Sequence, residues 1–120
     1  MAETRWQDIY NHLKKSGFDV YSPGVKTGEC TSNYVVVKND GNSKMLSFST
    51  NLELYSVMCY VPQKAYSTLE AYKESVKKAM KGIYPMVKEY GSETPSFFDD
   101  SIKAHMISIE YVVHKKYEYM

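Results

Sequence analysis

The chain has 120 residues, of which 43% are hydrophobic, so it is long enough for one packed domain and too short for two ordinary ones. Its 15 basic and 14 acidic residues leave a formal charge of +1, which creates no overall field to attract nucleic acid or an anionic membrane. We therefore expect a single domain over residues 1–120 and disfavour functions that depend on free nucleic-acid binding.

The two cysteines and the hydropathy pattern indicate where the protein is made. Cys30 and Cys59 are too few for a disulfide framework and have no metal-binding spacing, which favours two reduced thiols in a cytosolic setting. No apolar run approaches the roughly 20 residues of a transmembrane helix, and residues 1–6 are polar rather than signal-like. We expect a soluble protein with no membrane partner.

Tyrosine is unusually frequent, with 12 residues against one tryptophan and four phenylalanines. A tyrosine ring is apolar and its tip is polar, so a surplus suits surfaces that become buried on assembly. Sheet proteins also favour tyrosine for its packing in strands. Both interpretations stay open.

The first expected element is a helix of about three turns near the N-terminus. Thr4 and Gln7 form a capping box, and Gly17 with Phe18 matches the left-handed C′ position and its hydrophobic partner at a helix end. The apolar stripe between these signals consists of Trp6, Ile9, Tyr10 and Leu13. Residues 19–21 are then predicted to form a short strand, and residues 22–32, rich in turn formers, a loop.

A hairpin and a central strand are expected next. Residues 34–38 are β-branched, residues 39–42 have turn chemistry, and residues 44–49 resume an apolar pattern. After a break at residues 50–51, both faces of residues 54–61 are largely apolar, which is typical of a central strand that Pro62 ends.

The strongest helix signal covers residues 67–83. Ser67 and Glu70 form a capping box, Glu74 precedes Lys77 and Lys78 at favourable spacing, and Pro85 ends the helix. The stripe predicted to face the sheet consists of Leu69, Tyr72, Val76, Ala79, Met80 and Ile83. We expect the opposite face, with Lys77, Lys78 and Lys81, to be the part of this helix that meets a neighbouring subunit.

The C-terminal third is predicted to end in a long strand. Residues 86–90 fit either a strand or a loop, residues 91–100 are loop-like, residues 102–115 alternate as a strand with one buried face, and residues 117–120 are expected to fray. The 91–100 loop contains two adjacent phenylalanines beside a proline and two acids. Either one phenylalanine enters a partner, or the loop folds onto its own core.

These elements predict an α+β fold: a single antiparallel or mixed β-sheet of four to five strands with two α-helices packed on one face. The other face of the sheet is left to solvent or to a neighbour.

No constellation of catalytic, cofactor-binding or metal-binding residues is visible in the sequence. The three histidines match no zinc motif, and residues 24–28 lack the strand and helix that a phosphate loop requires. The exception that remains open is His105, which a folded-back Asp99 or Asp100 would orient as a base. The basic doublets at residues 14–15, 77–78 and 115–116 fit solvated faces.

Several segments spread over nearly the whole chain carry a family resemblance. They are Tyr21-Ser22-Pro23-Gly24, Gly28-Glu29-Cys30, Tyr34-Val35-Val36-Val37-Lys38, Tyr60-Val61-Pro62, Tyr66-Ser67, Glu93-Thr94-Pro95, Asp99-Asp100 and Lys103-Ala104-His105-Met106. Together they resemble small neck proteins of tailed bacteriophages and of prophages of Gram-positive bacteria, often labelled minor capsid or tail terminator proteins.

The resemblance implies a structural virion protein rather than an enzyme. Such a tail terminator forms a ring, usually a homo-hexamer, that caps the tail tube, stops polymerisation of the major tail tube protein and docks on the head–tail connector. It is assembled in the host bacterial cytoplasm, becomes part of the virion neck, needs no cofactor, and lets DNA pass its lumen without specific binding. The interface residues that we expect are Tyr21, Lys26, Glu29, Tyr90, Phe97, Phe98, Asp99 and Asp100.

Two alternatives remain open. Within the virion, the chain fits a head-side connector or tail completion protein in the adjacent ring. Outside it, the chain fits a small host enzyme that uses the neighbourhood of His105, or an adaptor that binds an extended peptide along a free sheet edge.

Overall fold

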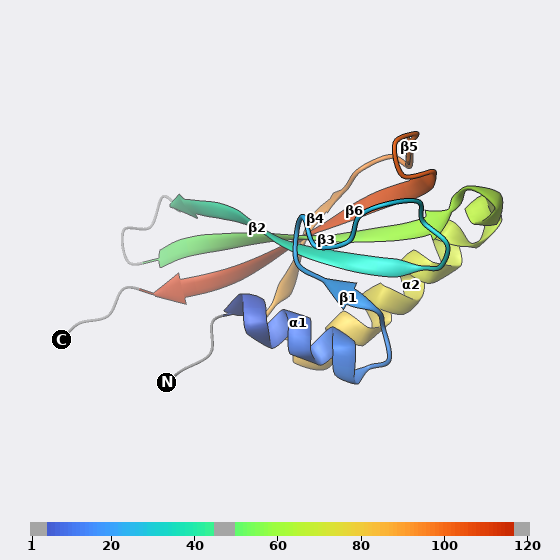
Figure 1. The fold of residues 1–120 in the computed structure, drawn as a ribbon. Helices are drawn as coiled ribbons and strands as arrows, with labels where there is room; N and C mark the ends of the chain where they lie inside the picture. Colours follow the sequence, from blue (N-terminus) through green and yellow to red (C-terminus); the bar gives the residue numbers. More distant parts are fainter. Residues whose placement is uncertain (1–4, 45–49, 117–120) are drawn as a thin grey trace.

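The computed structural model describes residues 5–44 and 50–116, and Figure 1 shows their arrangement. Each of the two α-helices is followed by a group of strands, and short 3₁₀ helices (η) lie on both sides of the second α-helix. The elements are α1 (Arg5–Lys15), β1 (Val20–Tyr21), β2 (Tyr34–Lys44), β3 (Thr50–Pro62), η1 (Gln63–Thr68), α2 (Leu69–Met80), η2 (Lys81–Ile83), β4 (Lys88–Glu93), β5 (Phe97–Asp99) and β6 (Ala104–Lys116).

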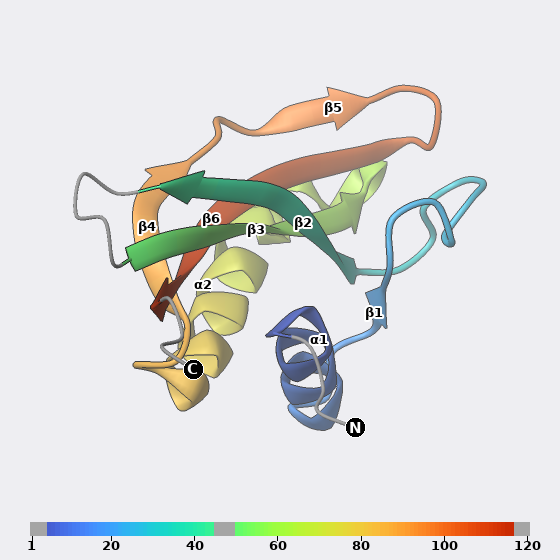
Figure 2. The same cartoon turned by 90° about the vertical axis from the view of Figure 1, so that its left-hand side faces the viewer.

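In the described part of the chain, six strands form one mixed sheet with the order β1-β2-β3-β6-β4, and β5 also pairs with β6. The β1–β2 pair is parallel and the other pairs are antiparallel. Both α-helices lie on the same face of the sheet (Figures 1 and 2). The predicted α+β fold is confirmed, with six strands in place of the four to five expected.

The core lies between this face of the sheet and the two helices. Its α2 residues follow the predicted stripe: Leu69, Val76 and Met80 are buried, whereas Tyr72, Ala79 and Ile83 pack against the core at its margin. The other buried members are Ile9, Leu13, Val20, Val35, Val37, Tyr55, Val57, Cys59, Val61, Val87, Ile107, Ile109, Tyr111 and Val113. The buried residues of the strands alternate with a period of two, and they pack against the apolar stripe of the helix, as the sequence predicts.

The start of α2 differs from the prediction, although helical conformation reaches Ile83 through η2. The capping box of Ser67 and Glu70 is wrong, because Ser67 lies inside η1 and Thr68 occupies the N-cap with no side-chain cap hydrogen bond. Thr68 instead donates its hydroxyl to the carbonyl oxygen of Ala65 at 2.6 Å. The chain enters α2 already helical, so the extended backbone that a capping residue needs is absent.

The end of α1 is confirmed in detail. Gly17 has a φ of 100°, its amide donates to the carbonyl of Lys14, and the amide of Phe18 donates to the carbonyl of Leu13, both at 3.1 Å. These two bonds define a Schellman motif. The Phe18 ring then contacts the edge of Tyr72 at 5.8 Å between ring centres, which places α1 beside α2. Thr4 of the expected capping box lies outside the described residues.

In the hairpin predicted over residues 34–49, the turn expected at residues 39–42 is wrong. β2 continues through residues 39–42, and the register shifts between the pairs Asn39–Tyr55 and Gly41–Leu54, which marks a β-bulge. The Gly41 amide donates to the side-chain oxygen of Asn39 at 2.7 Å. This local bond satisfies an amide without reversing the chain, so pairing with β3 continues. The predicted strand residues 45–49 lie outside the described residues, and the expected break at residues 50–51 is the start of β3.

The C-terminal part contains more strand than expected. β4 resolves the ambiguity of residues 86–90, while residues 91–93 and β5 fall in the predicted loop 91–100 and correct it. β6 confirms the long strand, with alternate residues buried on the helix side. The tail at residues 117–120 lies outside the described residues.

Val76 tests whether the α2 stripe maintains the fold, because its side chain is fully buried against the sheet. Val76→Asp should cost about 4 kcal/mol or more of stability, since a carboxylate would be buried without a partner, and should leave little folded protein. Chemical denaturation followed by circular dichroism measures this. Ser75→Asp, on the exposed side of the same turn, is the matched control and should change stability by less than about 1 kcal/mol. A soluble Val76→Asp variant of wild-type stability would show that the stripe has been misinterpreted.

Candidate interaction surfaces

A tyrosine cluster lies on the sheet face opposite the helices. Tyr34 in β2 and Tyr60 in β3 are directly opposite each other, with ring centres 4.7 Å apart and planes 12° apart. Tyr21, from β1, meets Tyr34 edge-on at 5.7 Å. Burial raises the pKa of Tyr34 to about 12, so its hydroxyl stays protonated at neutral pH. We call these three residues the tyrosine cluster.

The loop after β1 and the β5–β6 turn close around the tyrosine cluster. The Lys26 amine lies 5.6 Å from the centre of the Tyr21 ring and 5.7 Å from that of Tyr34, and both are cation–π contacts. Asp99 lines the same groove, which has a volume of about 270 Å³. A backbone bond of 2.7 Å from Cys30 to Ile102 joins the loop to the turn. The structure thus brings three of the predicted interface residues to this region, namely Tyr21, Lys26 and Asp99.

The other predicted interface residues are distributed less tightly. Asp100 pairs with Lys103 at 2.8 Å, and the pKa of Lys103 is raised first by that bond and further by the charges of Asp100 and Glu29. Phe97 and Phe98 point to opposite faces of the sheet, as neighbours in a strand do, because they pair with Met106 and His105. Tyr90 lies apart from this group, in β4.

His105 does not contact either aspartate that was considered as its orienting partner. Its Nε2 atom bonds to the carbonyl oxygen of Gln63 at 3.1 Å, and its ring lies against Tyr66 and Phe98. Asp99 instead accepts from Ser101 at 2.6 Å, and Asp100 holds Lys103. The arrangement fits a packed histidine at the end of the sheet.

Both cysteines are free thiols, and both are buried, including Cys30 in the loop after β1. Burial raises the pKa of the Cys59 thiol to about 12 and raises that of Cys30 as well. Cys30 donates its thiol proton to the Ser32 carbonyl at 3.3 Å. Raised pKa values keep both thiols protonated, which is the inert form.

An ion-pair network that the sequence analysis missed joins α2 to β4. Lys73 is only 6% exposed, and its amine lies 2.5 Å from Glu70 and 3.0 Å from Glu93. Lys77 bonds the other oxygen of Glu93 at 2.6 Å and lies 3.6 Å from Glu89. Position 73 falls near the apolar stripe of the helix, but nothing in its residue type indicated burial. The expected outward face is also corrected at Lys77, which turns toward β4.

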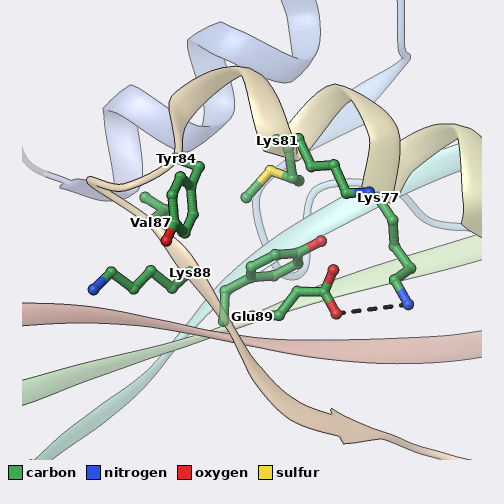
Figure 3. A pocket seen from close by; sticks show the side chains of 8 residues that line it. Lys77, Lys81, Tyr84, Val87, Lys88 and Glu89 are labelled. Atoms are coloured by element: carbon green, nitrogen blue, oxygen red, sulfur yellow. Dashed lines mark ion pairs between the residues drawn. The ribbon is translucent and has the colours of Figure 1, made fainter.

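A pocket of about 360 Å³ opens between the end of α2, η2 and the start of β4. Figure 3 shows Lys77, Lys81, Tyr84 and Lys88 around it, with Glu89 paired to Lys77. Met80, Val87 and Tyr111 complete the lining. We call these eight residues the α2–β4 pocket. Seven of them lie within residues 77–89, and Tyr111 comes from β6, so the pocket depends on a contact that the local sequence does not show.

Two carboxyl groups approach each other on the open face of the sheet. The Ser56 hydroxyl bonds to Asp40, at the β2 bulge, and lies 3.2 Å from Glu110 in β6. Burial raises the pKa of Glu110, and its contact with Asp40 raises that pKa further. Glu110 therefore keeps its proton to a higher pH than an exposed glutamate does.

In comparisons with known proteins, no family model matches this sequence, and no curated protein matches it. Among the helices within residues 5–44 and 50–116, none has the length and apolar character needed to cross a membrane. Over those same residues there is no group of three or more His, Cys, Asp or Glu side chains placed to hold a metal ion. The resemblance to tail terminators stays a prediction.

Glu93 should make the protein sensitive to acid. Hydrogen bonds from Lys77 and then Lys73 lower its pKa, so its contribution is present above the pKa of the unfolded state and is lost as pH falls through the folded pKa. Glu93→Gln should therefore lose about 1–3 kcal/mol at pH 7 and much less near pH 3, measured by denaturant unfolding at both pH values. Glu74→Gln is the control, because Glu74 is well exposed and lies 3.5 Å from Lys73. Equal losses at both pH values would contradict this assignment.

Glu110 should have the opposite pH dependence. Its raised pKa means that its contribution to stability is full below the pKa of the unfolded state and is lost as pH rises through the folded pKa. Glu110→Gln removes the charge and should raise the melting temperature at pH 7, with the gain disappearing toward pH 4. Thermal unfolding across this range measures it, and Asp40→Asn should behave alike. A gain that does not vary with pH would argue against a raised pKa of Glu110.

Proposed function

We propose that this chain is a structural virion protein, a tail terminator whose homo-oligomeric ring caps the tail tube and docks on the head–tail connector. The observation that carries the proposal is an extension of the sheet with unpaired edges, considered together with the resemblance of the sequence. The proposal assigns function to surfaces between chains rather than to a catalytic centre.

The extension consists of residues 38–44, 50–54 and 112–116, and we call it the arm. The Trp6 indole donates to the Val37 carbonyl at 2.7 Å, so α1 contacts β2 where the arm begins. Figure 1 shows the three strands continuing past α1 at the left of the view. Helix cover therefore decreases along the arm (Figure 1), although Val113 near its start still belongs to the core.

Both long edges of the arm are open to other chains. β1 pairs with β2 at Val35 and Val36, and within the described residues no strand pairs with the outer edge of β2 in the arm. On the other side, β4 pairs with β6 no further than Val112. Unpaired strand edges bind other strands readily. A ring subunit needs such edges to meet the tail tube protein or the connector.

Charge is compatible with DNA passage through the ring. The net charge of +1 is close to neutral, and a lumen that passes DNA benefits from few tight phosphate contacts, which would slow transit. The tyrosine cluster adds surface of the amphipathic kind that interfaces use. We propose the virion neck as its location, with assembly in the host bacterial cytoplasm.

Gene deletion tests the proposal in the phage or prophage that encodes this chain. Loss of a terminator should give tails longer than those of the parent phage in negatively stained particles, because tube polymerisation no longer stops. Complementation with the wild-type gene should restore normal length, and the Val76→Asp gene, which should not give folded protein, should fail to restore it.

The same experiment separates the alternative role in the neck. Loss of a head-side connector should leave tails of normal length and heads that are not joined to them. Tails of normal length attached to heads in the deletion strain would overturn both roles. Purified protein should in addition form rings visible by electron microscopy if the chain is the terminator.

A further inference from the structure

Two highly exposed aromatic side chains lie at separate places on the subunit. Tyr84, at 65% exposure, lies at the α2–β4 pocket, and Phe97, at 57%, lies in β5. Large exposed rings of this kind are typical of interfaces. The two places differ in charge as well as in shape.

The β5 patch consists of Phe97, Asp99 and Asp100. Phe97 pairs with Met106, which places its ring on the open face of the sheet. Figure 2 shows β5 along the upper rim of the sheet, outside the helix layer. Asp99 and Asp100 follow after Phe98, and Lys103, which pairs with Asp100, is the single basic residue in the turn. The patch is an apolar ring beside an acidic turn.

The α2–β4 pocket has complementary character. Its rim carries three lysines and one glutamate. Lys77 is engaged by Glu89 and Glu93, whereas Lys81 and Lys88 form no ion pair within residues 5–44 and 50–116. Met80 and Val87 provide an apolar wall. A ring flanked by carboxylates matches such a pocket in both hydrophobicity and charge.

The pocket also contains a polar group without a partner. Tyr111 is 2% exposed, and within the described residues its hydroxyl has no hydrogen-bond partner. Burial raises its pKa, so the hydroxyl keeps its proton. An unsatisfied buried hydroxyl is destabilising, and a backbone polar atom of an inserted segment would give it a partner.

The two places face different directions. Phe97 pairs with Met106 and Glu89 pairs with Tyr111, so they lie five residues apart along β6, roughly 17 Å at about 3.4 Å per residue. Phe97 is on the open face, whereas Tyr111 belongs to the core on the helix face. A two-fold contact would need both places on one surface. Their separation favours a head-to-tail contact, which repeats around a ring or along a chain of copies.

We propose that the α2–β4 pocket receives Phe97 of a second copy of this chain, with Lys81 and Lys88 facing the acidic turn that follows it. This rests on the proposed function and specifies how neighbouring copies in the ring would meet. The arm edges then remain available for contacts with the adjacent rings.

Two variants each disable one side of the proposed contact between copies. Phe97→Ser removes the inserted ring, and Lys81→Glu combined with Lys88→Glu reverses the charge of the pocket. Sedimentation velocity over a concentration series should show the wild-type chain beyond the dimer, and each variant should associate at least about 10-fold more weakly. A 1:1 mixture retains one intact pocket and one intact β5 patch, so it should form heterodimers and stop there.

Matched controls separate this from general effects. Val25→Ser removes another exposed apolar side chain, and Lys14→Glu with Lys15→Glu makes the same charge change at the exposed end of α1. Both should assemble as the wild type does. If the charge-reversed variant does not fold by circular dichroism, Tyr84→Ser tests the same pocket.

The outcomes also distinguish the two proposals. Rings that form equally well from the Phe97→Ser and pocket variants would overturn the contact and leave the terminator role standing. Variant rings that form but fail to attach to tail tubes would also overturn the contact between copies, because they would assign the pocket to another partner. A wild-type chain that stays monomeric at every concentration would overturn the contact, and normal tails in the deletion strain would overturn the function.

Discussion

The buried amine of Lys73 connects the two layers of the molecule. β4 pairs with β6 at only three positions with a register shift between them, so its strand pairing alone holds it weakly. Lys73 and Lys77 both bind Glu93, which fixes the end of β4 against α2. Removing Glu93 would take away the carboxylate that both lysines share, which would weaken this link between α2 and β4. The link lies beside the α2–β4 pocket, because Lys77 also lines that pocket.

Features set by neighbours in sequence were predictable. The α2 stripe follows from one helical period, and the end of α1 follows from Gly17 and Phe18 within a single turn. The alternation of apolar side chains in β6 also indicates directly a strand with one buried face. In each case the interactions that decide the structure lie within a few residues, so local patterns were sufficient.

Features that depend on distant partners were not predictable. The Asn39–Gly41 segment has the composition of a turn, yet pairing with β3 keeps it in the sheet as a bulge. Lys73 is buried because Glu93, 20 residues away, returns to it. Among the expected interface residues, Lys26 and Asp99 line one groove, near the backbone bond that joins their two loops, a contact that no spacing in the sequence encodes.

In the proposed contact, folding and assembly would use largely separate side chains. Phe97 and Tyr84 are mostly exposed, so the subunit gains little stability from them and can present them to another chain. Lys77 is the residue where the two roles coincide, because it lines the pocket while its charge is held by Glu89 and Glu93. That pairing leaves Lys81 and Lys88 as the charges able to respond to an acidic partner. The network that stabilises the subunit therefore also determines which part of the pocket attracts its occupant.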